Sequence, residues 1–405
     1  MRAGFWRADR RMRILHVSSV YPPHVVGGAE KVVAMLAEGQ AARGIDVGAA
    51  YLSRDAQPAG ERHGVTVLPQ RSRNLVWMED VFAARRPMRT ANKLAQMVDT
   101  RAAADFAGAI ETFRPDIVHT HSMVELPPLI WSAIARSGAK CVHTLHDYDL
   151  ICSRASLFRH GRSCQTRHAS CRITGAWKAR FAGRIDGVAA VSQPVLDEHR
   201  RVGLFQDLAA SRARVIWNGV DVPAATARPA VQGDIVFGFL GRLVPEKGIE
   251  TLLAACRLLP ATGWRLRVAG RAQEGDAAYR ALAAGLPVDF LGFTDPSAFL
   301  RSIDVLVVPS IWREPFGLTV VEAFAQHVPV IGARLGAIGD LVGPVGDDWL
   351  VPPGDASALA RRMLAVMHDG RAALPPPHAF ADVLTMVTPQ RMLDAYDALY
   401  ADVLS

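Results

Sequence analysis

The segment 313–322 combines two carboxylates, Glu314 and Glu322, with a proline and a glycine just before an apolar run. Gly317 lets the backbone approach a ligand closely, and the helix that we expect to begin near Leu318 has free N–H groups that favour an anion. The spacing places Glu322 one turn inside that helix and Glu314 in the preceding loop. The segment is therefore suited to a phosphorylated sugar, although such a turn is also common in ordinary loops.

Two further segments have residues that suit a phosphate group. Arg242 and Lys247 lie five positions apart, and a forked guanidinium and an ammonium at this spacing can clamp a diphosphate. Gly27 and Gly28 precede an expected helix and could bring backbone N–H groups to a phosphate or a sugar, but an ordinary loop-to-helix junction explains them equally well. The sequence has no G-x-G-x-x-G in a strand-turn-helix setting and no G-x-x-x-x-G-K-[ST], which disfavours a nicotinamide dehydrogenase and a P-loop ATPase.

The elements that must position these residues are short apolar strands alternating with helical periods, a pattern typical of parallel sheets flanked by helices. We expect strands at 13–19, 47–53, 65–69, 117–120, 142–145 and 188–191, and then at 235–240, 265–268, 288–291, 305–308 and 330–331. The pattern predicts an α/β protein of two Rossmann-like, doubly wound domains, in which ligands bind beyond the carboxyl ends of the strands.

We expect the first domain to span 1–205, the second 206–387, and a C-terminal helix at 388–405 to rejoin the first domain. The boundary is predicted between about 204 and 234, where an Asn-Gly turn at 218–219 precedes a connector that contains Pro223 and Pro229.

The composition is that of a globular enzyme, with 50% hydrophobic and 21% charged residues in 405. No apolar run approaches the roughly 18 residues that cross a bilayer, and the basic N-terminus has no signal-peptide core, so we expect a cytoplasmic protein.

The net charge of +7 indicates an anionic partner. Between Asp149 and Asp186 there is no acidic residue, while basic residues from Arg154 to Arg184 alternate with aromatic and aliphatic ones. This run predicts either peripheral contact with an anionic membrane at its inner face or a solvated basic surface, and the sequence does not choose between them.

The five cysteines are expected to be reduced, since no secretion signal is visible. Cys141 and Cys256 lie on apolar faces and are most simply core residues. Three others lie in the basic segment beside a histidine and could form a zinc site, although free thiols fit their spacing better. The candidate zinc ligands are Cys152, Cys164, His168 and Cys171.

As a set, these motifs resemble the retaining glycosyltransferases of family four, which have the two-lobed GT-B fold with an interdomain cleft. The resemblance covers nearly the whole chain. It implies that Arg242 and Lys247 hold the diphosphate of a donor, that the backbone of Phe316, Gly317 and Leu318 supports it, and that Glu322 binds the ribose. Gly27 and Gly28 would add donor contacts. The segment around Gly339 departs from the family, which often has a Pro-Glu pair there.

The resemblance also implies a chemistry. Glu314 would contact the donor sugar, and His121, which follows an expected strand, matches a family histidine near the reacting sugar; His146 and Asp147 compete for that role. The leaving phosphate itself would accept the acceptor's proton, so that neither a metal nor a cofactor is required.

The function that we predict is transfer of a hexose, with retention of configuration, from a UDP- or GDP-sugar to a saccharide or lipid-linked hydroxyl, in polysaccharide or glycolipid assembly. No nucleic-acid partner is expected. The alternatives are a non-catalytic nucleotide-binding protein of the same fold and a nucleotide-sugar epimerase.

Overall fold

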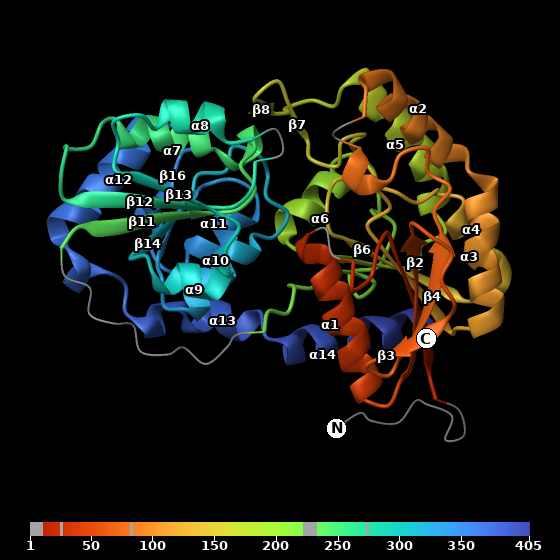
Figure 1. Ribbon diagram of the computed structural model, residues 1–405. Coiled ribbons are helices and arrows are strands. Elements are labelled where there is room, and N and C mark those ends of the chain that lie inside the picture. Colours follow the sequence, from red (N-terminus) through yellow and green to blue (C-terminus); the bar gives the residue numbers. More distant parts are fainter. Residues whose placement is uncertain (1–10, 25–26, 82–83, 222–232, 273–274) are drawn as a thin grey trace. The chain divides into compact units, whose positions relative to one another are not determined.

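The structure is a computed structural model that describes residues 11–24, 27–81, 84–221, 233–272 and 275–405. The chain divides into two compact units (Figure 1). Unit 1 comprises Met1–Ala155, Arg167–Gly219 and Pro389–Ser405, and unit 2 comprises Ser156–Thr166 and Val220–Thr388.

Unit 1 is built around a sheet in the order β10-β9-β6-β5-β1-β2-β4-β3, parallel throughout except for β3. Its inner strands are buried along almost their whole length, as expected when helices cover both faces of a sheet, although β5 and β6 also contain histidines and threonines. The strands are β1 (Arg13–Ser18), β2 (Asp46–Ser53), β3 (Gly60–Arg62), β4 (Val65–Arg71), β5 (Ile117–His121), β6 (Lys140–Leu145), β9 (Gly187–Ala190) and β10 (Ala213–Val215).

One face of this sheet is covered by α1 and by the C-terminal helix α14, which pack together (Figure 1). The buried residues of α14 recur at helical spacing and meet strand residues such as Ile117 and Val142 in one core cluster. The helices of unit 1 are α1 (Gly28–Ala42), η1 (Met78–Asp80), α2 (Arg86–Val98), α3 (Thr100–Phe113), α4 (Ile130–Ser137), α5 (Ala169–Ala182), α6 (Gln193–Arg200) and α14 (Pro389–Leu404).

Unit 2 has a parallel sheet in the order β13-β12-β11-β14-β15-β16 and a small hairpin of β7 and β8. In Figure 1, α7 and α8 lie on one side of its strands and α9 and α13 on the other. The strands are β7 (Phe158–Arg159), β8 (Arg162–Ser163), β11 (Ile235–Leu240), β12 (Trp264–Ala269), β13 (Val288–Gly292), β14 (Val305–Val308), β15 (Val330–Ala333) and β16 (Leu350–Val351).

Two helices of unit 2 begin at an aspartate that caps them. Asp295 and Asp355 each accept a hydrogen bond from the backbone N–H three residues later, at the starts of α9 and α12. The helices are η2 (Pro245–Lys247), α7 (Ile249–Cys256), α8 (Ala277–Leu282), α9 (Pro296–Arg301), α10 (Leu318–Ala325), α11 (Ala337–Val342), η3 (Asp347–Trp349), α12 (Ala356–Asp369), η4 (Arg371–Ala373), η5 (Pro377–Phe380) and α13 (Ala381–Met386).

Each large sheet has a point at which the direction of winding reverses. In unit 1 the chain moves outward from β1 through β2 and returns to β5 on the other side of β1; in unit 2 it moves from β11 through β12 and returns to β14. The loops that leave the carboxyl ends of β1 and β5, and of β11 and β14, are therefore the expected ligand-binding loops.

The unit boundaries differ from the expected ones in two places. Unit 1 continues to Gly219 rather than to 205, because Ala213–Val215 pairs with β9 as a further strand of its sheet. The segment Ser156–Thr166 belongs to unit 2, where Ser163 Oγ donates a hydrogen bond to the carbonyl of Ile311 at 2.9 Å. The predicted connector with Pro223 and Pro229 lies outside the described residues.

No helix within the described ranges is both long enough and apolar enough to cross a membrane.

Candidate active site

Two loops of unit 2, which follow β11 and β14 at the point where the winding of the sheet reverses, bring Lys247 and Glu314 together. These are called the reversal loops. The loop after β11 ends in the short helix η2, which contains Lys247, and the loop after β14 contains Glu314. The N–H of Ile311 donates to the carbonyl of Glu246 at 2.9 Å and ties the two loops to each other. Gly248 has φ +73°, and a Cβ there would stand 1.9 Å from the carbonyl oxygen of Pro309, so only glycine fits this crossing.

Lys247 Nζ forms an ion pair with Glu314 Oε1. The carboxylate also accepts a hydrogen bond from Ser310 Oγ at 3.2 Å, and the ammonium lies 5.6 Å from the ring centroid of Trp312. The side chain of Glu314 is 7% exposed and that of Lys247 is 23% exposed. The carboxylate is thus buried and held by two partners, while the Lys247 side chain stays partly exposed and can reach an anionic ligand.

The backbone of Glu314 is fixed by the loop after β15. Glu314 and Gly336 form an isolated parallel bridge, and the N–H of Ala337 donates to the carbonyl of Glu314 at 2.9 Å. Gly336 has φ +60°, and a Cβ at this position would lie 2.5 Å from that carbonyl oxygen. A side chain at Gly336 would displace the loop that holds the carboxylate.

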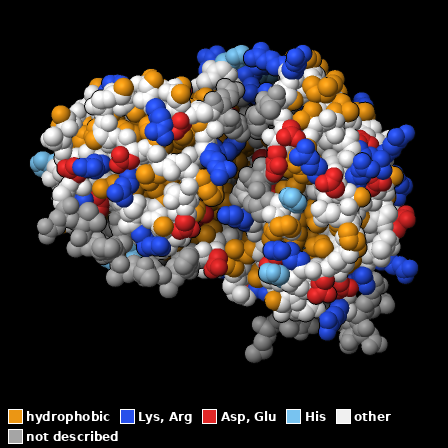
Figure 2. All heavy atoms as spheres, viewed as in Figure 1, with side chains coloured by type: hydrophobic (Ala, Val, Ile, Leu, Met, Phe, Trp, Pro, Cys, Tyr) orange, Lys and Arg blue, Asp and Glu red, His pale blue; other side chains and the backbone are white. Residues whose placement is uncertain are grey.

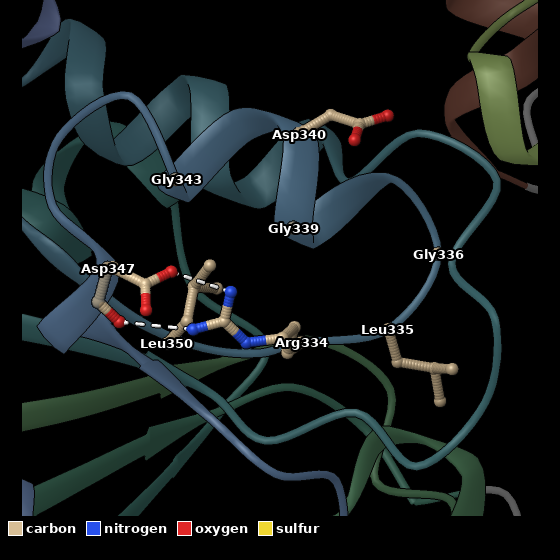
Figure 3. A pocket seen from close by; sticks show the side chains of 8 residues that line it. All are labelled: Arg334, Leu335, Gly336, Gly339, Asp340, Gly343, Asp347 and Leu350. Atoms are coloured by element: carbon tan, nitrogen blue, oxygen red, sulfur yellow. Dashed lines mark hydrogen bonds and ion pairs between the residues drawn. The ribbon is translucent and has the colours of Figure 1, made fainter.

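Beside this bridge lies a depression of about 370 Å³ (Figure 3). The ion pair of Arg334 Nη1 with Asp347 Oδ1, at 2.6 Å, neutralises the guanidinium that lines it. None of the predicted site residues lines it, so we do not place the chemistry there. Its lining is Arg334, Leu335, Gly336, Gly339, Asp340, Gly343, Asp347 and Leu350.

The helix predicted to begin near Leu318 is α10, and Gly317 caps its start with φ +94°. Phe316 is buried and anchors the turn, and Glu322 lies half-buried on the second turn of the helix. The first N–H groups of α10 have no partner within the helix, which makes this end a favourable place for an anion.

Arg242 lies in the loop after β11 with an exposed side chain. This loop is pinned by a close approach of two backbones: the N–H of Gly241 donates to the carbonyl of Ala269 at 3.0 Å, and a Cβ on Gly270 would stand 1.7 Å from Gly241 O. Within the described part of the chain, the guanidinium has no carboxylate partner. It is therefore available to an anionic ligand.

In unit 1, His121 is the last residue of β5 and lies at the reversal point of that sheet. It is not a solitary strand-end histidine. His121 Nε2 lies 2.9 Å from His16 Nδ1, and His121 Nδ1 lies 3.0 Å from His146 Nε2. His16 Nε2 in turn lies 2.8 Å from the amide oxygen of Gln40, which links β1, β5, the loop after β6 and α1.

The amide oxygen of Gln40 sets the direction of this chain because it only accepts hydrogen bonds. His16 must then donate from Nε2 to Gln40, which leaves its Nδ1 as an acceptor. His121 therefore donates from Nε2 to His16, and its own Nδ1 accepts. By the same reasoning, His146 donates from Nε2 to His121 Nδ1. All three imidazoles are neutral in this arrangement, and His146, the least buried of them, has Nδ1 left as an acceptor.

Burial supports the neutral state. It lowers the pKa of His16 and of His146 to about 4, and it lowers the pKa of His121 well below the ordinary value, with the neighbouring histidines adding to the effect. Burial and the neighbouring Asp149 raise the pKa of Asp147 to about 6. They outweigh the hydrogen bond that Asp147 accepts from Ser122 Oγ at 2.6 Å, which by itself lowers the pKa. Of the competing candidates, His146 bonds to His121 directly, and Asp147 bonds to Ser122, the next residue along the chain.

A cluster of three histidines is the one group, within the described residues, whose ligand atoms are close enough for a metal ion. One ring nitrogen from each of His16, His119 and His121 lies within 4.8 Å of the others. All their ring nitrogens have hydrogen-bond partners, since His119 bonds to Tyr400 OH and Thr144 Oγ1 at 2.7 Å each. These contacts account for the histidines as a polar network of the core.

Gly27 and Gly28 begin α1, with Gly27 as its N-cap. The N–H of Gly27 donates to Glu30 Oε2 of its own helix at 2.8 Å. The sequence suggested that this N–H group contacts a phosphate or a sugar, but in the structure it bonds to a side chain of the same helix. The free N–H groups at the start of α1 are those of the residues that follow Gly27.

The basic segment differs from the expectation at Lys178. This residue is 2% exposed and forms an ion pair with the buried Asp149, to which Lys93 Nζ also lies at 3.5 Å. It is therefore not part of a charged surface, because a buried ammonium needs a carboxylate partner.

The cysteines are all free thiols, and Cys141 and Cys256 are buried in the core as expected. Cys152 and Cys171 lie in unit 1 with their sulfur atoms 3.9 Å apart, whereas Cys164 belongs to unit 2. Zinc binding by these residues and His168 stays an untested hypothesis.

Sequence reasoning missed Ser310, Trp312, His16 and Gln40. Ser310 and Trp312 lie in the loop after β14, so the rule that ligands bind at the carboxyl ends of strands could have found them. Gln40 could also have been found, because it is a polar residue at a position of its helix where the spacing predicts a buried apolar one.

Comparisons with known proteins agree with this geometry. The family described as glycosyl transferases group 1 matches residues 225–380, and the family described as glycosyltransferase family 4 matches residues 26–223. The chain is 30% identical over 385 residues to a glycogen synthase of Mycobacterium tuberculosis, covering 89% of this chain and 87% of the relative. It is 31% identical over 271 residues to a phosphatidyl-myo-inositol mannosyltransferase of Mycobacterium leprae, covering 63% of this chain and 64% of that protein.

Among solved structures, Anabaena HepE in complex with UDP resembles this chain with a TM-score of 0.71 and 21% identity, covering 96% of this chain and 100% of that one. This likeness and the two parallel-sheet units identify the GT-B fold. The chain therefore belongs to the group 1 glycosyltransferases and is a glycosyltransferase of the family-four type.

Proposed function

We propose that the protein transfers a hexosyl group from a nucleotide-sugar donor, UDP- or GDP-linked, to a hydroxyl group of a saccharide or lipid-linked acceptor, with retention of anomeric configuration and without a metal ion. The observation that carries this proposal is the pairing of Lys247 with Glu314 at the reversal point of the second sheet. One solved neighbour in complex with UDP supports the donor class, and the relatives, a glycogen synthase and a phosphatidyl-myo-inositol mannosyltransferase, support glycosyl transfer.

In the proposed reaction, the bond between the anomeric carbon and the diphosphate oxygen breaks and a bond to the acceptor oxygen forms. Negative charge develops on the leaving diphosphate. Lys247 and the exposed Arg242 stabilise that charge, and the N–H groups at the start of α10, after Phe316 and Gly317, add to the effect. Glu322 binds the ribose.

The acceptor's proton passes to a diphosphate oxygen on the same face of the sugar, which retains the configuration and requires no protein nucleophile. Glu314 is then a group that contacts and positions the donor sugar, while Ser310 and Lys247 hold its carboxylate. His121 is a neutral imidazole, because burial lowers its pKa well below the ordinary value, and its two ring nitrogens bond to His16 and His146. It therefore acts by orienting His146, whose Nδ1 is left to accept a hydrogen bond from a ligand.

The test is incubation with a panel of nucleotide sugars, with saccharide and lipid-linked acceptors, in the presence and absence of EDTA. We expect release of the nucleoside diphosphate that depends on acceptor and persists with EDTA, and a product whose anomeric proton coupling matches the donor's. Binding without release would indicate a non-catalytic nucleotide-binding protein. Conversion of the donor without release would indicate an epimerase, and loss of activity with EDTA would contradict the metal-free step.

A further inference from the structure

Helix α2 presents its apolar side to solvent. Its buried residues are Asn92, Gln96 and Met97. The residues Pro87, Ala91, Leu94 and Val98 follow one another at helical spacing and are all exposed, with the side chains of Leu94 and Val98 among the most exposed large apolar groups of the described chain.

The inner side of α2 is mostly polar and makes several hydrogen bonds. Asn92 Oδ1 accepts from the N–H of Val76 at 3.1 Å, and Gln96 Nε2 donates to Glu125 at 2.5 Å. Lys93 Nζ donates to the carbonyl of Val124 at 2.6 Å. These contacts fix which side of the helix faces inward, so the exposure of the apolar side follows from the fold.

Helix α5 extends the same surface. Trp177 Nε1 donates to the carbonyl of Met97 at 2.9 Å and joins α5 to the end of α2. Ile173 of α5 is 70% exposed, and Arg172 and Arg180 are exposed on the same helix. In the region of these helices, Figure 2 shows hydrophobic side chains beside lysines and arginines.

The charge that these two helices carry is of one sign. Neither α2 nor α5 contains an aspartate or a glutamate. The inward lysines, Lys93 and Lys178, both pair with Asp149, whereas Arg172 and Arg180, exposed on α5, have no carboxylate partner within the described residues.

We propose that the outer face of α2 and α5 docks on an anionic lipid surface, with Leu94, Val98 and Ile173 inserted at the headgroup level and the arginines beside the phosphates. The combination of an exposed apolar stripe with unpaired cations fits such a surface. A second copy of the chain fits poorly, since a two-fold contact would set like-charged arginines against one another. This proposal goes beyond the proposed function, because docking requires neither donor nor acceptor.

The test is sedimentation with vesicles of phosphatidylcholine alone and of phosphatidylcholine with phosphatidylglycerol, at low and high salt. We expect binding only to the anionic vesicles, weakened by salt. The double variants Leu94→Asp with Val98→Asp, and Arg172→Glu with Arg180→Glu, should each bind at least tenfold more weakly. Matched controls on unit 2, Leu258→Asp and Arg361→Glu, change equally exposed residues and should bind as the unchanged protein does.

A second measurement guards against a variant that fails to fold. In the unchanged protein, hydrogen exchange with anionic vesicles should slow in 86–98 and 169–184 and not elsewhere in unit 1. Equal binding to neutral vesicles, equal weakening by the controls, or no binding would overturn the proposal. A dimer in solution that the Leu94 and Val98 substitutions abolish would assign the face to a second copy instead.

Discussion

At the scale of single residues, the pairing of Lys247 with Glu314 determines how the site can meet an anion. A buried carboxylate is costly unless it is paired and hydrogen-bonded, and Glu314 has both an ammonium and a hydroxyl as partners. The pair is therefore pre-organised: the carboxylate holds the ammonium where a diphosphate can approach its exposed side.

We predict that Lys247→Ala and Glu314→Gln each lower sugar transfer by more than tenfold, which corresponds to at least about 1.4 kcal/mol of barrier. Lys247→Ala removes the charge that would stabilise the leaving diphosphate, and Glu314→Gln keeps the shape but removes the charge that orients the ammonium. Initial rates of nucleoside diphosphate release measure the effect.

Glu246→Gln is the matched control, because it removes a neighbouring carboxylate that has no role in the proposed reaction. Its rate should stay within about twofold of the unchanged protein. Near-normal turnover in both Lys247→Ala and Glu314→Gln would remove these residues from the site.

At the scale of elements, two connections hold the functional loops in place. Helix α14 reaches the sheet of unit 1 from the far end of the sequence, and its Tyr400 hydroxyl bonds to His119 Nδ1 at 2.7 Å and to Gln40 Nε2 at 3.2 Å. In unit 2, Gly248 lets the loop after β11 pass close to the loop after β14.

Tyr400→Phe should destabilise unit 1 by about 1–3 kcal/mol, because it leaves two buried polar groups without a partner. Tyr21→Phe is the control: its ring is also buried, but its hydroxyl has no hydrogen-bond partner among the described residues, so its removal should cost little or nothing. Urea unfolding measures both, and an equal loss in the two variants would contradict the network.

Gly248→Ala should lower both stability and transfer activity. The new methyl group would meet the carbonyl of Pro309 at a backbone angle that alanine rarely adopts, so the loop with Lys247 would have to move away from the loop with Glu314. The control is Gly339→Ala, which lies inside α11 with nothing within 4 Å of the new atom and should be neutral or stabilising. Thermal unfolding and initial rates distinguish the two, and a Gly248 variant with unchanged rate would contradict this role for the glycine.

At the scale of the whole molecule, buried histidines make the stability depend on pH. Burial lowers the pKa of His16, His146 and His199 to about 4 and that of His143 to about 3, whereas in the unfolded chain each titrates near 6.5. The unfolded chain therefore binds more protons between these values, and stability is lost as the pH falls below about 6.5. Asp147 acts in the opposite sense, because its raised pKa of about 6 favours the folded state at low pH.

Burial also raises the pKa of Glu125 and of Asp397, but the buried histidines outnumber these carboxylates. We therefore predict a net fall in the free energy of unfolding between pH 7.5 and 5, with about 2 kcal/mol from each histidine as the upper limit. Urea titrations at several pH values measure it. His199→Gln should flatten the profile, while His368→Gln, at an exposed position, should leave it unchanged. A profile that is flat in the unchanged protein would contradict the neutral network.

Much of the fold could be predicted from the sequence, because local patterns decide it. The strand 235–240 and the helix that begins at Leu318 both occur where the residue patterns place them. Alternation of apolar strands with helices is a property of neighbouring residues, and it suffices to specify parallel sheets and the end at which their loops gather.

The contacts that complete the site were decided by tertiary structure alone. The burial of Lys178 on Asp149, the partnership of Lys247 with Glu314 and the chain of imidazoles that ends at Gln40 join residues far apart in the sequence. Periodicity shows which side of a helix is apolar but not which side the fold buries, and in α2 it buries the polar one. The reason is physical: a hydrogen bond or an ion pair depends on distance and burial, and these exist only once the chain has folded.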